Sequence, residues 1–308
     1  MTTMTTSTNG QESLLNKVMT PPYLGLFIFL VILIYKPVAH CVLVLQHIYF
    51  TGPEKYLVGF LVGLAGVALV GKGLRRDELT ATAMGYMGGA LIWMGWFEYS
   101  FDLFGSLFAL PPIKDPVSGA NVISANLQVL EATAIPFLAM LILFGNNRET
   151  RCRLLMWFHR NTKLSPEKPT SGYRRNYAWV TAFETIFITW AFYLQIIILY
   201  DPRIVGFSHP VTFAMFFVYL AWGIYLIAKL SRFTEPAAAI RYAIPTVAVF
   251  WISIEMGSHW GWFTEIWVRP LQWPISNALF ILAFVAGTAL VLIRGAERAP
   301  AMQAQAAE

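Results

Sequence analysis

Charged side chains are scarce in this sequence. Asp, Glu, Lys and Arg together make up 13% of the 308 residues, whereas 57% of the residues are hydrophobic. Soluble domains carry about 25% charged residues, and the mean hydropathy of this chain is +0.56. The composition therefore excludes an ordinary soluble domain and predicts an all-α membrane protein, whose helices satisfy their own backbone hydrogen bonds.

Cysteine is also scarce, and the signatures of common enzyme classes are missing. Cys41 lies in an apolar run and Cys152 in a basic loop, on opposite sides of the predicted membrane, so no disulfide framework is expected. The sequence has no HExxH motif, no Gly-rich phosphate loop and no paired Asp-rich motif. Its five histidines are too dispersed to form the His box of a di-iron desaturase.

Long apolar runs fill most of the chain instead. Runs that can cross ~30 Å of hydrocarbon lie near residues 23–49, 56–74, 80–104, 126–144, 177–200, 211–230, 242–263 and 275–293. They predict a polytopic bundle of about eight transmembrane helices. Lys36 and Pro37 interrupt the first run, which we expect to be kinked or divided into two half-spans. The spacing of Gly59, Gly63 and Gly66 predicts a face for close helix packing.

The distribution of positive charge predicts the orientation of these helices. Seventeen of the 22 Lys and Arg residues fall in the segments that share a side with the two termini, and four fall in the opposite loops. Positive residues favour the cytoplasmic side, so both termini are predicted to be cytoplasmic. The net charge of +5 is then a topology signal, and no nucleic-acid partner is expected. Residues 1–20 and 297–308 are predicted to be disordered polar tails, and 146–175 a basic segment on the inner leaflet.

Ionisable residues gather near the predicted outer ends of the helices. At 1.5 Å per residue, Glu255 lies roughly 20 Å from the inner end of its run, and His259 one turn further out. Their spacing of four residues puts both on one helix face. The same outer region contains Glu98, Asp102, Glu131, His40, His47, Asp201 and His209. Each would be costly facing lipid, so we expect protein, water or a metal beside them.

Several polar residues have simpler explanations. His47, Asp102 and Glu265 are expected to be solvated interfacial residues. Glu184 lies near the inner end of its run, where we expect it to bond to a neighbouring helix or a basic residue. Lys36 lies at mid-span and is expected to face the bundle and a carboxylate.

Four motifs, in their order, resemble one known family. They are "WMGWFEYS" at 93–100, "VLEATAI" at 129–135, "RRNY" at 174–177 and "EMGSHWGWFTEIWVRPLQ" at 255–272. From about residue 80 to 295, the chain resembles the C subunit of the copper-dependent membrane monooxygenases that oxidise methane, short alkanes or ammonia. The resemblance divides the chain into two additional helices at 21–78 and a C-subunit-like bundle at 79–296.

The resemblance implies a metal site on the outer side of this subunit. Its ligands would be Asp201, His209, Glu255 and His259, holding copper or alternatively zinc, with Glu98 and Glu131 orienting the ligands or carrying protons. The sequence departs from the family at three places. Glu255 stands where the family has Asn, Gln272 stands where it has a later His, and no residue answers to its middle His. No catalytic residue is assigned.

The implied activity is the hydroxylation of methane, a short alkane or ammonia with O2 and a reductant, which we expect to be quinol. The implied partners are A-type and B-type monooxygenase subunits in a trimer of heterotrimers, with lipid around them. The implied location is a bacterial inner or intracytoplasmic membrane. Two alternatives stay open. One is a proton-conducting or transport subunit, in which the same carboxylates relay protons and no metal binds. The other is a non-catalytic assembly subunit of a membrane complex, which the missing histidines favour.

Overall fold

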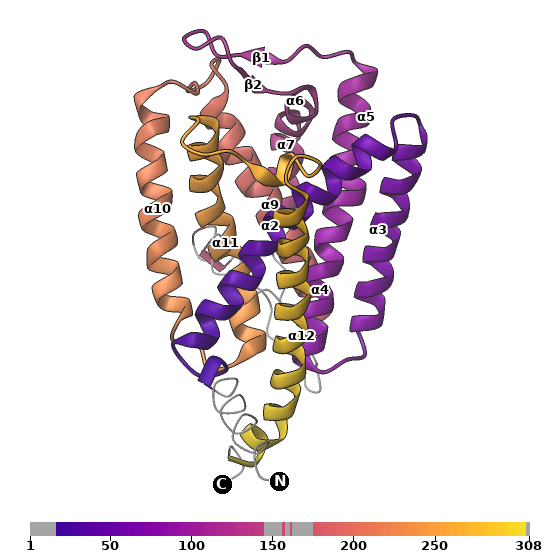
Figure 1. Ribbon diagram of the computed structural model, residues 1–308, viewed down its shortest axis with the longest axis vertical. Coiled ribbons are helices and arrows are strands. Elements are labelled where there is room, and N and C mark those ends of the chain that lie inside the picture. Colours follow the sequence, from indigo (N-terminus) through magenta and orange to yellow (C-terminus); the bar gives the residue numbers. More distant parts are fainter. Residues whose placement is uncertain (1–16, 145–155, 158–160, 162–174, 306–308) are drawn as a thin grey trace, which may run out of the picture.

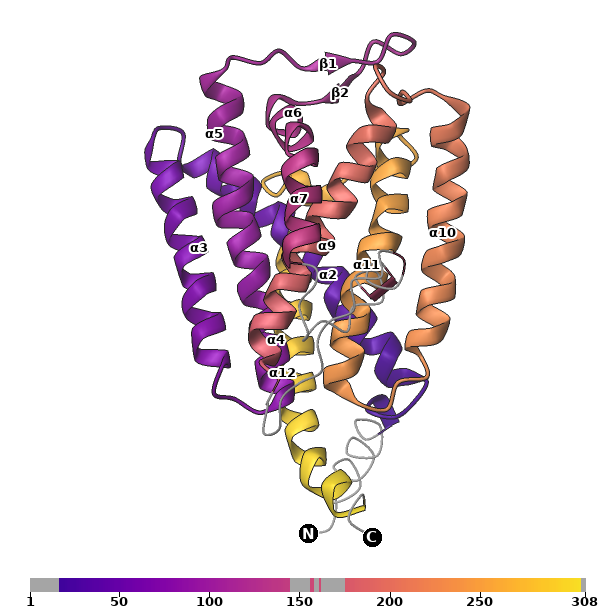
Figure 2. The same cartoon turned by 180° about the vertical axis from the view of Figure 1, so that it is seen from behind.

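A computed structural model of the protein describes residues 17–144, 156–157, 161 and 175–305. The described chain is almost entirely helical, which confirms the predicted all-α class (Figures 1 and 2). Most of the predicted basic segment at 146–175 and most of the predicted tail at 1–20 lie outside the described residues. At the other end, helix continues to Gln305, beyond residue 297 where the sequence predicts a disordered tail to begin.

The elements follow one another in this order. They are α2 (Tyr23–Tyr49), α3 (Glu54–Gly73), α4 (Glu78–Ile92), the π-helix η1 (Trp93–Glu98), α5 (Tyr99–Leu107), β1 (Ile113–Lys114), β2 (Asn121–Ile123), α6 (Ala125–Ala132), α7 (Ala134–Phe144), α9 (Tyr177–Tyr200), α10 (Pro210–Leu230), α11 (Pro236–His259), the short 3₁₀ helix η2 (Ile266–Val268) and α12 (Pro274–Gln305).

The number of spans can be compared with the eight apolar runs. Among the described residues, seven helical segments are long and apolar enough to cross a membrane: α2, α3, the α6–α7 segment, α9, α10, α11 and α12. The remaining run, 80–104, is covered by α4, η1 and α5, which follow one another without a break from Glu78 to Leu107. The protein is therefore a multi-pass membrane protein.

Two helices form the centre of the bundle. Over their most apolar windows, α9 is 61% and α11 67% buried, whereas α10 and α12 are each 22% buried. Helix α2 crosses the bundle obliquely beside α11 and α12 (Figures 1 and 2). Although α2 contains Pro37, it is one helix from Tyr23 to Tyr49, so of the two predicted alternatives, a kinked helix or two half-spans, the half-spans are not seen. Apolar side chains on the peripheral helices face outward, as expected for lipid contact.

The predicted glycine face of α3 packs against α4, η1 and α5. A Cβ atom added to Gly66 would lie 2.6 Å from the carbonyl oxygen of Gly88, so the two backbones are in direct contact. An added Cβ at Gly59 would meet Tyr99, and one at Gly63 would meet Trp96. The prediction of close packing at these glycines is confirmed.

A small loop structure covers one end of the bundle, which we call the outer end. Strands β1 and β2 pair in an antiparallel hairpin there (Figure 1). The Asp115 carboxylate Oδ2 accepts hydrogen bonds from Ser118 and, at 2.7 Å, from Ser208 in the α9–α10 loop. These bonds hold the pKa of Asp115 below its ordinary value, although burial alone would raise it. The hairpin is thereby tied to the α9–α10 loop, next to the start of α10.

Candidate functional site

A π-helix positions Glu98, the first residue of the candidate site. The α-helical hydrogen-bond pattern of α4 changes to a π-helix at Trp93, and the chain returns to α-helix at Tyr99. Such π segments are rare and often mark functional sites. Its last residue is Glu98, whose Oε1 accepts a hydrogen bond of 2.9 Å from the indole Nε1 of Trp93. The Trp93 ring stacks on Tyr193 of α9 with ring centroids 5.8 Å apart, which fixes the position of the indole.

Two adjoining cavities lie inside the bundle beside this π-helix. The larger contains about 630 Å³ of empty space, counting the part that is open to the outside, and its walls include Lys36, His40, Trp93, Glu98 and Tyr193. The walls of the smaller, about 270 Å³, include Trp251 and Glu255. Lys36 and Tyr193 line both cavities, so we treat them together as the polar cavity. It collects ionisable groups from α2, η1 and α11, which are far apart in the sequence.

Two carboxylates but only one lysine are named among the residues that line the polar cavity. His40 Nε2 lies 3.9 Å from Glu255 Oε1, and the His40 ring is stacked on Trp251 with centroids 5.9 Å apart. Within the described part of the chain, no carboxylate lies within 4.0 Å of the Lys36 ammonium. Lys36 thus faces the bundle as predicted, but it approaches Glu98 and Glu255 only across the cavity. Two carboxylates and one ammonium face a space that must contain water or a ligand.

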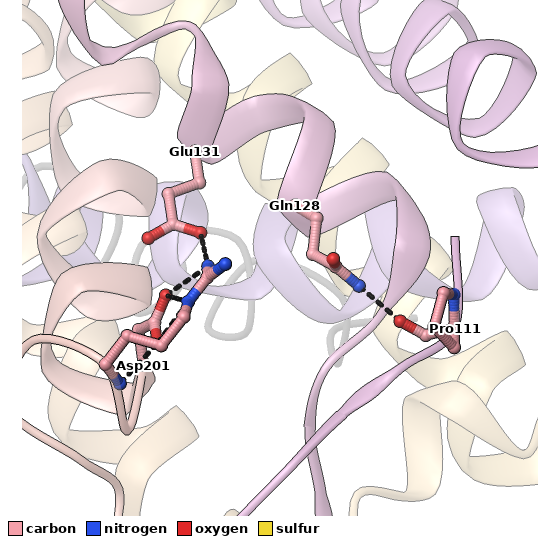
Figure 3. Close-up of polar contacts among 5 residues, drawn as sticks. Pro111, Gln128, Glu131 and Asp201 are labelled. Carbon is pink, nitrogen blue, oxygen red and sulfur yellow. Dashed lines mark hydrogen bonds and ion pairs between the residues drawn. The ribbon is translucent and has the colours of Figure 1, made fainter. Parts of the chain in front are cut away.

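Asp201, the first of the predicted metal ligands, belongs to a separate ionic cluster at the outer end of α9. Its side chain is fully buried, and Oδ1 accepts 2.7 Å and 2.9 Å bonds from the backbone N and Nε of Arg203. Arg203 Nη2 also donates to Glu131 Oε2 at 2.9 Å (Figure 3). Beside it, Gln128 Nε2 of α6 donates to the Pro111 carbonyl. Arg203 therefore satisfies the two acids that the sequence predicts to lie near a metal.

The other three predicted ligands point to different partners. His209 is the N-cap of α10, where its Nδ1 accepts from the backbone N of Val211 at 3.1 Å. The Nδ1 of His259 is 2.9 Å from the backbone carbonyl of Glu255, and its ring contacts Tyr200. The Glu255 carboxylate instead lies beside His40.

The positions of the four predicted ligands can be compared with one another. In the part of the chain that the structure describes, no group of three or more His, Cys, Asp or Glu residues is arranged to hold a metal ion. Asp201, His209, Glu255 and His259 are therefore not brought into one group, and as placed they do not fit a shared metal. The i, i+4 spacing correctly puts Glu255 and His259 on one stretch of α11, but their side chains reach different neighbours.

Two interfacial residues also behave differently from the prediction. Asp102 is paired with Lys55, whose Nζ lies 2.6 Å from Oδ2, and His47 Nε2 is 4.0 Å from the same oxygen. Glu265 accepts a 2.8 Å hydrogen bond from Ser258. Asp102 and Glu265 are thus partly buried and bonded to protein, whereas His47 is exposed, as predicted. Sequence reasoning did not single out Tyr193, because a tyrosine within an apolar run carries no distinctive pattern.

Comparison of the chain with protein-family models, with curated proteins and with solved structures found no match. The fold and the polar cavity define the class of molecule: a multi-pass helical membrane protein with ionisable side chains gathered inside the bundle.

Proposed function

We propose that this chain is a membrane subunit of a copper-dependent monooxygenase complex that hydroxylates methane, a short alkane or ammonia with O2. One observation supports this proposal. The segments Trp93–Glu98 and Glu255–His259 carry two of the motifs on which the resemblance rests, and residues of both line the polar cavity. Motifs so far apart in the chain meet around Lys36, as expected if they serve one site. Copper, O2 and the A-type and B-type partners come from the resemblance alone.

In this proposal, the chain's own contribution is the polar cavity. His40 and Glu255 form an imidazole and carboxylate pair, and Glu98 is oriented by the indole of Trp93. Such groups can hold protons at a defined depth and pass them on when their neighbours change charge. Asp201 and Glu131 have a different role, because Arg203 holds them together at the outer end. Since the predicted ligand set does not fit a shared metal, we route no step through a metal in this chain.

The proposal is tested with the complex purified from its native membrane. We expect A-type and B-type subunits to copurify, copper to be present, and the complex to hydroxylate an alkane or ammonia with consumption of O2. Glu98→Gln and Glu255→Gln should each lower turnover by roughly tenfold or more, as is typical for the loss of a proton-transfer group. The matched control is Glu54→Gln, because Glu54 is an exposed carboxylate at the start of α3. Purification of the chain without such partners and without oxygenase activity would refute the proposal.

A second candidate, a proton-conducting or transport subunit, is favoured by the position of Lys36. It lies 13 residues from each end of α2, which is roughly 20 Å by helix rise, so a cationic group lies at mid-span and lines a cavity that two carboxylates also line. Proteoliposomes with an internal pH indicator and an imposed potential would measure this activity. The candidate predicts a proton flux that Glu255→Gln abolishes, and a flux no larger than in protein-free vesicles would eliminate it.

A further inference from the structure

The larger part of the polar cavity follows one face of α2. Its lining residues on this helix include Ile32, Lys36, Ala39 and Leu43. Their spacings of three and four residues place them on the same side of the helix. From Ile32 to Leu43 the helix rises by roughly 16 Å toward the outer end. The cavity is therefore an elongated passage that runs outward from about the middle of the bundle.

An apolar cavity adjoins this passage on its inner side. Ile32 and Tyr86 line both spaces. Helices α2, α4 and α11 all run toward the outer end (Figure 1). On each of them the apolar cavity extends to earlier residues than the polar cavity does, namely Ile28, Ala83 and Ile240. Earlier residues on these helices are closer to the inner end, so the apolar cavity lies inward of the polar one.

The walls of the two spaces differ in chemistry. Four ionisable residues line the polar cavity and keep part of their surface accessible, namely Lys36, His40, Glu98 and Glu255. The accessible fraction of the side chain is 26% for His40 and 16% for Glu255, although both lie within the bundle. The described residues that line the apolar cavity include no Asp, Glu, Lys, Arg or His, and only one threonine and one tyrosine among them carry a hydroxyl group.

This difference separates a wet space from a dry one. Ionisable groups with accessible surface at membrane depth are costly beside lipid, so they require water. Apolar walls offer no hydrogen bonds, so a space that they line stays dry and stops ions. At the inner end, Leu24, Ile28 and Leu230 are each at most 1% exposed. An added Cβ at Gly25 would clash with the carbonyl group of Leu230, so α2 and the end of α10 are in direct backbone contact there.

We propose that the polar cavity is a water-filled inlet that opens to the outer side only and delivers protons to Glu98 and as deep as Lys36. Two carboxylates and one ammonium favour a proton or another small cation over an anion. A protonated water gives its proton to an ionised Glu98, which becomes neutral as a neutral water is released. The inference deepens the proposed function by naming the side that supplies protons, and it rests on that function only for their use.

The experiment measures from which side Ag⁺ reaches single cysteines in the full-length chain, in right-side-out and inside-out membrane vesicles. Cys41 and Cys152 are first replaced by alanine. One cysteine is then introduced, as Ala39→Cys in the polar cavity or as Ala83→Cys in the apolar cavity. Both changes add a single sulfur atom and leave every ionisable residue in place. Thiols that Ag⁺ has blocked fail to react with fluorescein maleimide after the chain is unfolded in detergent.

Ag⁺ should block Ala39→Cys at least roughly a hundredfold faster from the outer side than from the inner side, since an ion that enters the apolar barrier loses its water. Ala83→Cys should stay unblocked from both sides. Leu43→Cys, one turn further out in the polar cavity, repeats the outer measurement if Ala39→Cys fails to fold. Two exposed loop residues are the controls for vesicle orientation, Thr264→Cys at the outer end and Thr234→Cys at the inner end. Gel filtration checks that each variant elutes as the wild-type protein does.

Slow blocking of both Ala39→Cys and Leu43→Cys from the outer side, while Thr264→Cys reacts, would overturn the inference because the cavity would be closed. Blocking of Ala39→Cys at equal rates from the two sides would also overturn it, and would favour the proton-conducting candidate, which needs contact with both sides. Blocking of Ala83→Cys from either side would overturn the dry barrier on which the inference depends.

The two proposals fail separately. Outer-side access in a protein that shows no oxygenase activity would refute only the proposed function. Oxygenase activity in a complex whose cavity is closed to Ag⁺ from the outer side would refute only the inlet.

Discussion

Arg203 lies between two carboxylates that the sequence places near a metal. It bonds to both oxygens of Asp201 and to Glu131, and so links the start of the α9–α10 loop to α6. Asp201 is fully buried, so removal of the guanidinium would leave a buried charge without its partner. The bonds of this single arginine explain why Asp201 is not available as a ligand.

Arg203→Met should lower the free energy of unfolding by about 2 kcal/mol. The value lies below that for breaking a fully buried pair, because the arginine side chain itself is 62% exposed and screened. Arg269→Met is the matched control, since Arg269 is another exposed arginine at the outer end. Denaturant unfolding in detergent measures the difference. Equal losses for the two variants would show that the cluster contributes nothing specific.

The same cluster predicts a pH dependence. Burial alone would raise the pKa of Asp201, but the hydrogen bonds from Arg203 outweigh burial and hold it below its ordinary value. The unfolded chain therefore binds a proton at a higher pH than the folded chain does. The stabilisation is fully present above the unfolded pKa, near pH 4, and is lost as the pH falls through the lower folded pKa.

Unfolding midpoints between about pH 6 and pH 3 should reveal this loss. The wild-type protein should lose stability toward the acid end more steeply than Asp201→Asn, which has no carboxyl group at this position to titrate. In Arg203→Met this loss should disappear or reverse, because burial then raises the folded pKa of Asp201 and protonation relieves the unpaired buried charge. Parallel curves for wild type and Asp201→Asn would contradict the assigned role.

At the scale of the helices, hydropathy alone predicts most spans to within a few residues. Long apolar runs leave little freedom in where a membrane helix can lie. Apart from α12, which continues to Gln305 beyond its predicted run at 275–293, the exception is α11, predicted at 242–263 and found at Pro236–His259. It begins early because Pro236 suits the first turn of a helix. It ends early because the chain turns at Gly261, which has a φ of +78°, so the following aromatic residues belong to a loop.

The π-helix η1 could not be predicted from the sequence. The segment Trp93–Glu98 continues an apolar helical pattern, and nothing in its residue types indicates a π-helix. Its consequence is substantial, because the wider turn accompanies the Trp93 to Glu98 bond and the placement of Glu98 at the polar cavity. The sequence could identify Glu98 as costly to bury, but the direction in which it points depends on this irregularity.

The contact between α3 and α4 gives a prediction at the scale of elements. Gly66→Leu should destabilise the protein by about 1–3 kcal/mol, since overpacking must push two backbones apart. Gly71→Leu on the same helix is the matched control, because an added Cβ there meets nothing within 4 Å. Thermal unfolding in detergent compares them. A Gly66→Leu protein as stable as Gly71→Leu would mean that the two helices do not pack as described.

At the scale of the whole molecule, the sequence predicts how deep a residue lies in the membrane better than it predicts which other residues it contacts. Helix rise places Glu98, Glu255 and His259 toward the outer ends, and position along α2 places Lys36 at mid-span. Which side chains meet depends on helix rotation and crossing, which apolar periodicity does not fix in helices that are apolar nearly all round. The predicted ligands therefore separate into different contacts, while Lys36, His40, Glu98 and Glu255 gather around one space.

The central claim is that Lys36, Glu98 and Glu255 face one internal space that extends from the middle of the bundle toward its outer end. A cryo-electron microscopy map of the complex in lipid nanodiscs measures this most directly. The account predicts the ammonium of Lys36 and both carboxylates around a common space that contains density for water or a bound ligand. A map in which Lys36 points toward acyl chains, or in which Glu98 and Glu255 open into unconnected spaces, would contradict it.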